Sequence, residues 1–405
     1  MTKDELLSGL PAKFHDDLTP EIHTLLIESK KTIIVLDDDP SGTNTVFDVP
    51  VLTDLSPDTI KDAIDEAPPV LFLLTHSKSL GTEQTTALHK NLGETLKEFE
   101  DDIIVISRSD SSLPGKFPIE TNTLREALDI PKAPTLFIPC LEADEPLTKS
   151  DFQSLSLVDI RSGDITTKLA DLPDGSTCFV DASSISDLNV LSLALLKSAR
   201  RFIIRSAASF VQSLAGIPSR PPLEPWQLQD LDPNPNGGLI IVGSHVPTTT
   251  DQLNHLLKNS PNLTGIKLSV PDIINSTFNL KSTITDAQTA LTSGQNVVLF
   301  TSRKRIDGDD DPTTSKAVSK TLVEIVRGIK DRPSFLVTKG GSTSSDIATE
   351  ALGVRQAQVL GQILPGVPVW TIGNETLHPG LAYVIFPGNV GDEDALTLAV
   401  EKLTP

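Results

Sequence analysis

Short, uninterrupted runs of apolar residues recur along this chain and constrain its fold more than any other feature. Each run spans three to five residues and contains no charged residue after its first position. Runs of this kind are typical of strands that are buried on both faces of a parallel sheet. The runs are TIIVL (32–36), VLFLL (70–74), DIIVI (102–106), TLFI (135–138), TCFV (177–180), RFII (201–204), LIIV (239–242), NVVLF (296–300), FLV (335–337), VPVW (367–370) and YVIF (383–386).

Helical patterns separate these runs and determine the fold class that we predict. Examples are SPDTIKDAIDEA, TEQTTALHKNLGETLKEF, DLNVLSLALLKSA and SKAVSKTLVEIVRGI. An alternation of strands and helices indicates α/β layers. We therefore expect two α/β domains, each with a mainly parallel sheet flanked by helices, and a ligand cleft between them.

A proline-rich stretch near the middle of the chain predicts the domain boundary. IPSRPPLEPWQLQDLDPNPNG (217–237) is rich in proline and polar residues and has no periodicity. We expect a substrate-binding domain over residues 1–220, a linker over residues 221–236 and a nucleotide-binding domain over residues 237–405. The 405 residues are enough for two separate cores.

The charge of the chain argues against two classes of partner. The formal net charge is −20, and such a surface repels nucleic acid and anionic membranes. The sequence contains no run of about 18 apolar residues and no amino-terminal signal-peptide pattern. We therefore expect a cytoplasmic protein that binds neither nucleic acid nor membrane, and an anionic substrate would need a locally positive pocket.

Acids, hydroxyls and basic residues follow the apolar runs of the first half. In parallel sheets, ligands bind beyond the carboxyl ends of the strands. The segments at these positions are Asp37-Asp38-Asp39, Thr75-His76-Ser77-Lys78 and Ser107-Arg108-Ser109-Asp110-Ser111-Ser112. The three consecutive aspartates suit a base for a substrate hydroxyl together with a carboxylate near Mg²⁺. A solvated acidic turn is the alternative that the sequence leaves open.

Glycines and hydroxyls follow the apolar runs of the second half. Gly340-Gly341-Ser342-Thr343 precedes the helical pattern SSDIATEALG. Glycines let the backbone approach a phosphate closely, and the first turn of a helix offers N–H groups to it. A plain strand-to-helix turn with a capping hydroxyl is the alternative. The sequence has no GxxxxGK[ST], GxGxxG or GxSxG motif, so P-loop, dinucleotide-binding and hydrolase interpretations lack support.

These segments, in this order, resemble the four-carbon acid sugar kinase family. VLDDDPSGTNTVFDVPVLT resembles the opening Asp-Asp-x-Thr-Gly segment of the family, and SRSDSSLPGKFPIET resembles its Asp-Ser-Thr-Leu-Arg-Gly segment. GLIIVGSHVPTTTDQL is similar to the Gly-Ser…Thr…Gln segment, and FLVTKGGSTSSDIATEALG is similar to the Gly-Gly-x-Thr segment. THSKSL, RFIIRSAASFVQSLAGI, ILPGVPVWTIG and YVIFPGNVGDEDAL occupy the places of further family segments, so that the resemblance covers most of residues 32–400.

The resemblance implies a function and a set of site residues. The amino-terminal domain would bind the sugar acid and the carboxy-terminal domain would bind ATP. With ATP and Mg²⁺ as cofactors, the product would be a 4-phosphorylated four-carbon sugar acid, such as a threonate or erythronate derivative. No metal site held by the protein alone is implied, and a homodimer is compatible with the sequence. The implied residues are Asp37 and Asp38 for catalysis; Ser77, Lys78, Arg108, Asp110, Ser111 and Ser112 for the sugar acid; and Ser244, Gly340, Gly341, Ser342, Thr343 and Gly388 for the nucleotide.

Three positions depart from the family pattern and leave two interpretations open. Pro114 stands where the family has an arginine, and Phe386 stands where it has a lysine. Lys78 replaces an arginine and keeps the charge but loses the bidentate fork. Phosphoryl transfer depends on positive charge at the transferred group. The chain is therefore either a sugar-acid kinase or a pseudokinase that binds nucleotide or sugar acid, and ATP consumption with a panel of tetronates separates the two.

Overall fold

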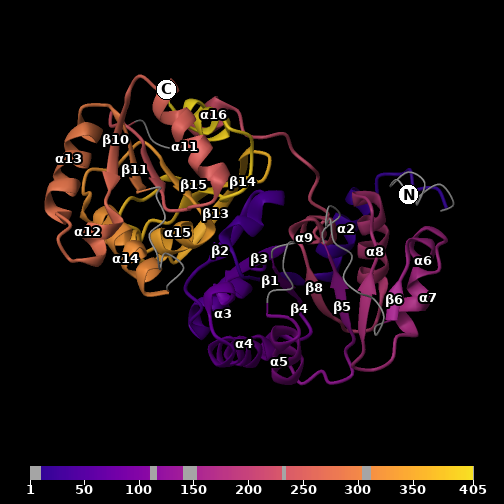
Figure 1. The fold of residues 1–405 in the computed structure, drawn as a ribbon. Helices are drawn as coiled ribbons and strands as arrows, with labels where there is room; N and C mark the ends of the chain where they lie inside the picture. The colour runs from indigo at the N-terminus through magenta and orange to yellow at the C-terminus, as the bar shows by residue number, and fades with distance from the viewer. Residues whose placement is uncertain (1–10, 110–115, 140–152, 230–233, 303–311, 405) are drawn as a thin grey trace. The chain divides into compact units, whose positions relative to one another are not determined.

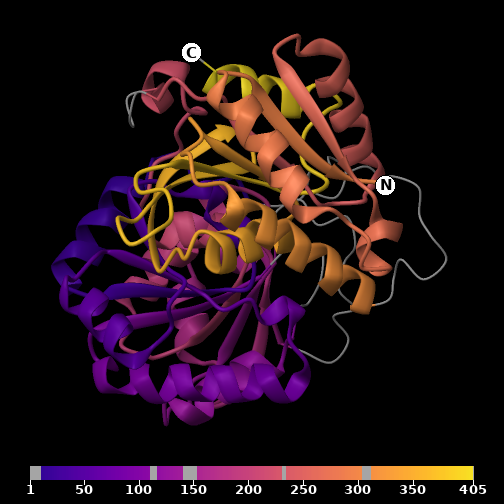
Figure 2. The same ribbon diagram turned by 90° about the vertical axis from the view of Figure 1, so that its left-hand side faces the viewer.

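Two compact units make up the chain in this computed structural model. The first unit is Met1–Ser219 and the second is Arg220–Pro405. Each has strands with helices on both faces (Figures 1 and 2), which confirms the predicted α/β class. The structure describes residues 11–109, 116–139, 153–229, 234–302 and 312–404.

The sheet of the first unit is parallel between all of its neighbouring strands. The strand order is β2-β3-β1-β4-β8-β5-β7-β6. The central strands are buried along their whole length, as their uninterrupted apolar runs predict. The strands are β1 (Thr32–Asp37), β2 (Val49–Leu52), β3 (Val70–Leu74), β4 (Ile103–Arg108), β5 (Thr135–Ile138), β6 (Gln153–Leu155), β7 (Thr177–Val180) and β8 (Ile203–Ser206).

Helices cover both faces of this sheet (Figure 1). On one face, α3 (Pro57–Asp65), α4 (Thr82–Leu96) and α5 (Ile119–Ala127) bury apolar residues at helical spacing, for example Ile60 and Ile64, against the strands. The other face carries α2 (Thr19–Ser29), α8 (Ile185–Lys197) and α9 (Ala208–Leu214), with α6 (Leu157–Arg161) and α7 (Ile165–Ala170) packed beside α8. Short 3₁₀ turns, η1 (Pro40–Thr45), η2 (Ser77–Ser79) and η3 (Lys97–Phe99), complete the unit.

The sheet of the second unit is mixed. Its order is β10-β11-β9-β12-β15-β14-β13. The first five strands are parallel, and β14 is antiparallel to both of its neighbours. The strands are β9 (Leu239–Val242), β10 (Leu263–Leu268), β11 (Asn296–Thr301), β12 (Leu336–Lys339), β13 (Gln356–Leu364), β14 (Val367–Ile372) and β15 (Ala382–Phe386).

Helices also lie on both faces of the second sheet (Figure 1). One face carries α10 (Pro225–Gln229), α11 (Pro247–Asn259) and α16 (Ala395–Leu403), which share an apolar core with the strands. The other carries α12 (Val270–Ile274), α13 (Leu280–Thr292), α14 (Pro312–Gly328) and α15 (Gly341–Asp346), and a π-helical turn, η4 (Ile347–Ala351), continues α15. None of the helices that the structure describes has the length and apolarity needed to span a membrane.

Part of the stretch that sequence analysis assigns to a linker packs on the second unit. The Leu223 N–H donates to the Gln362 carbonyl at 2.7 Å. Leu228, in α10, is buried in the same core as α11 and α16. The apolar residues between the prolines explain this packing, because they gain a buried environment that a solvated linker would not provide.

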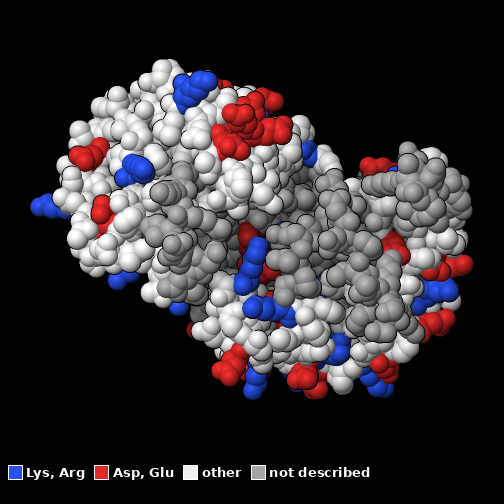
Figure 3. All heavy atoms as spheres, in the orientation of Figure 1, with Lys and Arg blue, Asp and Glu red and all other residues white. Residues whose placement is uncertain are grey.

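Charged side chains are dispersed over the face of the molecule drawn in Figure 3. One cluster of acidic groups stands out on the second unit, and other acidic groups lie along the rim of the first unit, where several have basic groups beside them. An anionic ligand that approaches this face therefore depends on local donors rather than on a broad basic surface.

Candidate functional site

A buried ion pair links the carboxyl ends of β1 and β4 in the first unit. Asp37 and Arg108 are register partners in these parallel strands. The Arg108 guanidinium donates to Asp37 Oδ1 at 2.9 Å, and the Asp39 N–H donates to the same oxygen at 3.0 Å. Burial raises the pKa of Asp37 to about 6, although Arg108 opposes this shift. The carboxylates in turn raise the pKa of Arg108, so this arginine stays charged.

Asp38 lies beside this pair, but fewer contacts offset the burial of its carboxylate. Its side chain is 4% exposed, and its Oδ1 is 3.8 Å from the Arg108 guanidinium. Within the described part of the chain, this buried oxygen has no hydrogen-bond partner. Burial raises the pKa of Asp38 to about 7, and the neighbouring Asp37 adds to the shift, while Arg108 opposes it. Asp38 is thus a carboxyl group that exchanges a proton near neutral pH, which is the property of a general base.

Gly42 holds the following turn against the ion pair. The turn η1 begins after Asp39, whose side chain accepts from the Ser41 N–H at 2.9 Å. A Cβ atom at position 42 would overlap Asp37 Oδ2 and the Arg108 guanidinium. The chain can pass this close to the pair only because Gly42 has no side chain.

A second buried network lies next to the carboxylates. Ser77 donates its hydroxyl proton to Glu120 Oε1 at 2.6 Å, and Arg205 donates to Glu120 Oε2 at 2.5 Å and to the Ser107 hydroxyl at 2.6 Å. His89 Nε2 is 3.8 Å from Glu120, and burial lowers the pKa of His89. Sequence analysis assigned no role to Glu120, Arg205 or His89, because these residues come from elements far apart in the sequence and only the fold brings them together.

The turn that carries Ser77 and Lys78 is held in an unusual backbone conformation. His76 has a φ of 53°, in the left-handed region that a non-glycine residue rarely adopts. Lys78 Nζ lies 3.5 Å from Asp39 Oδ2, and the lysine side chain is 43% exposed. Ser77, in contrast, is buried and committed to Glu120. The structure therefore brings Lys78 to the aspartates, whereas Ser77 belongs to the buried network around Glu120.

The remaining substrate residues from sequence analysis cannot be placed. Asp110, Ser111 and Ser112 lie outside the described residues, as does Pro114. Their roles stay predictions.

A pocket of about 430 Å³ lies in the second unit, at the carboxyl ends of β9, β12 and β15. All six residues predicted to bind nucleotide line it. Sequence analysis did not assign the rest of the lining. The full lining is Gly243, Ser244, His245, Val270, Thr314, Ser315, Val318, Ser319, Leu322, Gly340, Gly341, Ser342, Thr343, Asp346 and Gly388.

Close backbone contacts shape this pocket. Gly340 has a φ of 117°, and a Cβ atom there would lie 3.2 Å from the Cβ of Ser244. A Cβ atom at Gly388 would lie 2.9 Å from the Ser244 hydroxyl oxygen. Thr249 donates to the Gly388 carbonyl at 2.8 Å and so links this loop to α11. The glycines therefore let three loops meet where bulkier residues would force them apart.

The amino-terminal ends of two helices and the loop that leads into a third contribute to the lining. Ser244 and His245 precede α11, Thr314 and Ser315 lie in the first turn of α14, and Gly341 begins α15. Helix amino termini present N–H groups and positive dipole ends, which suit a ligand with several negative charges. Among the described lining residues there is no lysine or arginine, and Asp346 is the one carboxylate. Hydroxyls and backbone N–H groups must therefore supply most of the recognition.

One lysine lies buried at the base of these loops. Lys339, the last residue of β12, pairs in register with Phe386 of β15 and is fully buried. Its Nζ lies 3.9 Å from the centre of the Phe386 ring and donates to the Pro387 carbonyl at 2.5 Å. Burial lowers the pKa of Lys339 to about 7. A lysine side chain thus lies beside the position where Phe386 replaces the family lysine, but it comes from the neighbouring strand and its burial disfavours the charged form.

Models of two protein domains match the chain, one in each unit. A sugar-binding N-terminal domain matches residues 33–145, and a nucleotide-binding C-terminal domain matches residues 239–396. The first match contains Asp37, Asp38 and Arg108, and the second contains every residue of the 430 Å³ pocket. Among curated proteins, none matches the sequence.

Solved structures share the fold over nearly the whole chain. A Salmonella typhimurium LT2 protein with the provisional name tRNA synthase is 14% identical, with a TM-score of 0.65 over 91% of this chain and 98% of its own. A Haemophilus influenzae protein of the DUF1537 family is 16% identical, with a TM-score of 0.60 over 90% of this chain and 98% of its own. With a sugar-binding and a nucleotide-binding domain in this order, the chain belongs to the four-carbon acid sugar kinase family.

Proposed function

We propose that the chain is an ATP-dependent kinase that phosphorylates a hydroxyl group of a four-carbon sugar acid. The observation that carries this proposal is the pocket of the second unit, where the amino-terminal ends of two helices, the loop that leads into a third helix and four glycines converge. Such a pocket suits a chain of phosphates. The first unit is a sugar-binding domain with a proton acceptor near neutral pH, which suits a hydroxyl nucleophile.

Asp38 is the better candidate for the base, and Asp37 is an anchor. Asp37 Oδ1 already accepts from Arg108 and from the Asp39 N–H. Asp38 Oδ1 has no such partner among the described residues. In the proposed step, Asp38 accepts the proton of the substrate hydroxyl as its oxygen attacks the terminal phosphorus of ATP. The bond from that phosphorus to ADP breaks, and the proton remains on Asp38 until solvent removes it.

Lys78 is the basic group best suited to the acid group of the substrate. Its ammonium lies near the aspartates and is partly exposed, whereas Arg108 is buried and committed to Asp37. On the family resemblance we also propose that Asp110, Ser111 and Ser112, which lie outside the described residues, contact the substrate. Ser77 does not contact the substrate in this proposal, because its hydroxyl group already donates its proton to Glu120. Its role is to hold the Glu120 carboxylate in place.

The phosphates of ATP would lie against the loops around Gly340, Gly341 and Gly388. Ser244, Ser342 and Thr343 would donate hydroxyl hydrogens to them. The lining fits a nucleotide that arrives with Mg²⁺, because this ion is usually held by phosphates and only one or two carboxylates, and Asp346 lines the pocket. When bound, Mg²⁺ neutralises charge on the transferred group.

One observation favours a second candidate, a pseudokinase that binds nucleotide without transferring phosphate. The described lining of the pocket has no lysine or arginine, and loss of a transition-state cation can lower a rate about 10³-fold or more. Under this alternative the pocket still binds ATP, and Asp38 has no catalytic task.

A coupled ADP assay at high enzyme concentration tests the proposal. The wild type is compared with Asp38→Asn and Pro114→Arg on a panel of tetronates, and binding of an ATP analogue is measured beside it. Kinase chemistry predicts that Asp38→Asn abolishes turnover and that Pro114→Arg raises it. No turnover by the wild type or by Pro114→Arg, with the analogue still bound, would establish the pseudokinase. Unchanged analogue affinity in Gly341→Asp would contradict the assigned phosphate position, because that variant puts a carboxylate there.

A further inference from the structure

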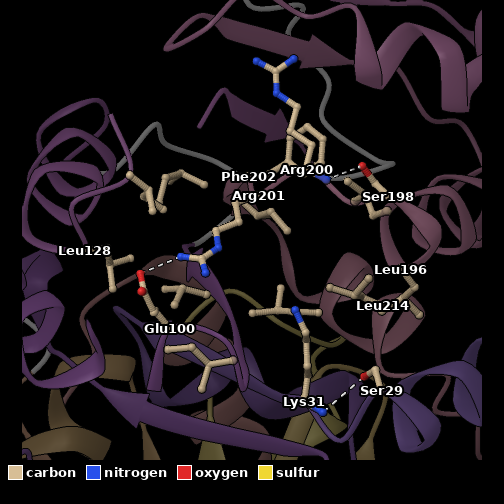
Figure 4. A pocket seen from close by; sticks show the side chains of 17 residues that line it. Ser29, Lys31, Glu100, Leu128, Leu196, Ser198, Arg200, Arg201, Phe202 and Leu214 are labelled. Atoms are coloured by element: carbon tan, nitrogen blue, oxygen red, sulfur yellow. Dashed lines mark hydrogen bonds and ion pairs between the residues drawn. The ribbon is translucent and has the colours of Figure 1, made fainter. Parts of the chain in front are cut away.

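A separate cavity of about 130 Å³ lies in the first unit (Figure 4). It is at the amino-terminal ends of the central strands, whereas the aspartates are at their carboxyl ends. Lys31 precedes β1, and the first residues of β4 and β8, beginning at Ile103 and Ile203, form its floor. Asp37 and Arg108 end the same strands, so the cavity shares no residue with the proposed kinase site.

The walls of this cavity are mainly apolar. Leu196 and Leu214 stand together on one side and Leu128 on the other (Figure 4). Leu128 and Leu214 are buried, and Leu196 is half-buried. A cavity of about 150 Å³ lined by such residues can bind benzene. The space therefore suits an apolar group of about four to six carbons by the same measure of size.

Basic side chains outnumber acidic ones in the lining. Arg201 is bound to Glu100 at 2.7 Å and to Asp101 at 2.6 Å, and Arg200 is bound to Asp174 at 2.8 Å. Lys31 Nζ, in contrast, forms no ion pair with any described residue. The backbone N–H of Lys31 donates to the Ser29 hydroxyl, which leaves the side chain available to a ligand. Figure 4 shows the side chain of Lys31 rising from the start of β1 into the cavity.

We propose that this cavity binds a small aliphatic monocarboxylate. Its carboxylate would pair with Lys31 Nζ, and its hydrocarbon chain would lie between Leu128 and the pair Leu196 and Leu214. A single negative charge fits better than a phosphate dianion, because Lys31 is the one basic group of the lining that has no ion pair with a described residue, and Glu100 lies in the same lining. The ligand is distinct from a sugar acid, whose several hydroxyl groups would find few partners on these walls.

The proposal is tested by methyl NMR on the full chain, with hexanoate as the probe. Hexan-1-ol and hexylamine keep the chain but remove or reverse the charge. We expect hexanoate to shift the methyl signals of Leu196 and Leu214 with saturation at millimolar concentration. Neither hexan-1-ol nor hexylamine should match its affinity, because a hydrogen bond to a charged group typically changes affinity about tenfold or more.

Three variants locate the binding. Lys31→Met removes the ammonium but keeps the length of the side chain, and should weaken hexanoate about tenfold or more. Leu196→Trp should abolish binding by filling the space of the cavity beside Leu214. The exposed neighbour variant Lys30→Met is the matched control and should bind like the wild type. Absence of saturable shifts, equal affinity for hexan-1-ol, or unchanged affinity in Lys31→Met would each overturn the proposal. None of these measurements uses kinase activity.

Discussion

Replacing Asp38 by asparagine should stabilise the first unit while removing the proposed base. Burial raises the pKa of Asp38 from an ordinary value of 3.8 to about 7. An acid whose pKa is raised by folding contributes stability at low pH and loses it as pH rises through the folded value. The amide of asparagine stays neutral at every pH, so Asp38→Asn keeps the form that the folded protein prefers.

The size of the effect follows from the two pKa values. The difference between 3.8 and about 7 corresponds to about 4 kcal/mol, which the variant should gain above about pH 8. The same relation gives a gain below about 1 kcal/mol at about pH 4, because a large part of the unfolded chain is then also protonated at this position. The gain in stability should therefore grow as the pH rises from about 4 to about 8. The variant should show no turnover at any pH in this range, because it lacks the proposed base.

Urea unfolding at several pH values measures this gain, followed by a signal from the first unit and analysed with a common slope. Asp65→Asn is the control, since its carboxylate is exposed at the end of α3 and its removal should change stability by less than about 0.5 kcal/mol. A variant that is less stable than the wild type at high pH, or a gain that does not depend on pH, would refute the assignment of Asp38 as a destabilising buried carboxyl group.

Four other outcomes are expected. Turnover of the wild type should rise with pH through about 7 as Asp38 loses its proton, and a flat profile of kcat against pH would remove it as the base. Gly42→Ala should destabilise the first unit by about 1–3 kcal/mol in thermal unfolding, because the new methyl group overlaps the Asp37–Arg108 pair. Arg205→Met should lower the free energy of unfolding by about 3–5 kcal/mol, because Glu120 is left buried without its cation; full stability would show that the pair is dispensable. Lys339→Met should raise the melting temperature below pH 7, with a gain that shrinks as pH approaches the ordinary lysine pKa of 10.5, because folding disfavours the charged amine; a loss at low pH would contradict this.

The apolar runs predicted the strands that lie inside the two sheets. The run 70–74 coincides with β3, and the run 239–242 coincides with β9. Four strands were missed: β2, β6, β10 and β13. They are edge or hairpin strands, or carry proline, glycine or alternating polar residues, as in LTGIKL and QAQVLGQIL. The strands β10 and β13 contribute few buried side chains, so their sequences contain no continuous apolar run. The strand β2 is mostly buried, but it is only four residues long and contains a proline.

The residues of the candidate sites divide in a similar way. Strand-end glycines and hydroxyls such as Gly340 and Ser244 could be identified, because the turn after a buried strand has a recognisable composition. Glu120 and Arg205 could not, since their contact joins α5 to β8 across many residues of sequence. Lys339 was hidden within a strand, where an apolar residue is the ordinary expectation. Only the pairing of β12 with β15 shows that Lys339 lies beside Phe386, the residue that stands where the family has a lysine.

The fit of Gly42 against Asp37 and Arg108 has a consequence for how these positions can vary during evolution. A larger residue at position 42 is incompatible with the ion pair, and either charge alone would be left buried without its partner. Single substitutions at any of the three positions should therefore be selected against, whereas combined changes can be tolerated. Relatives that carry a side chain at the position of Gly42 should have replaced the arginine and the aspartate as well, and the three positions should covary as one unit.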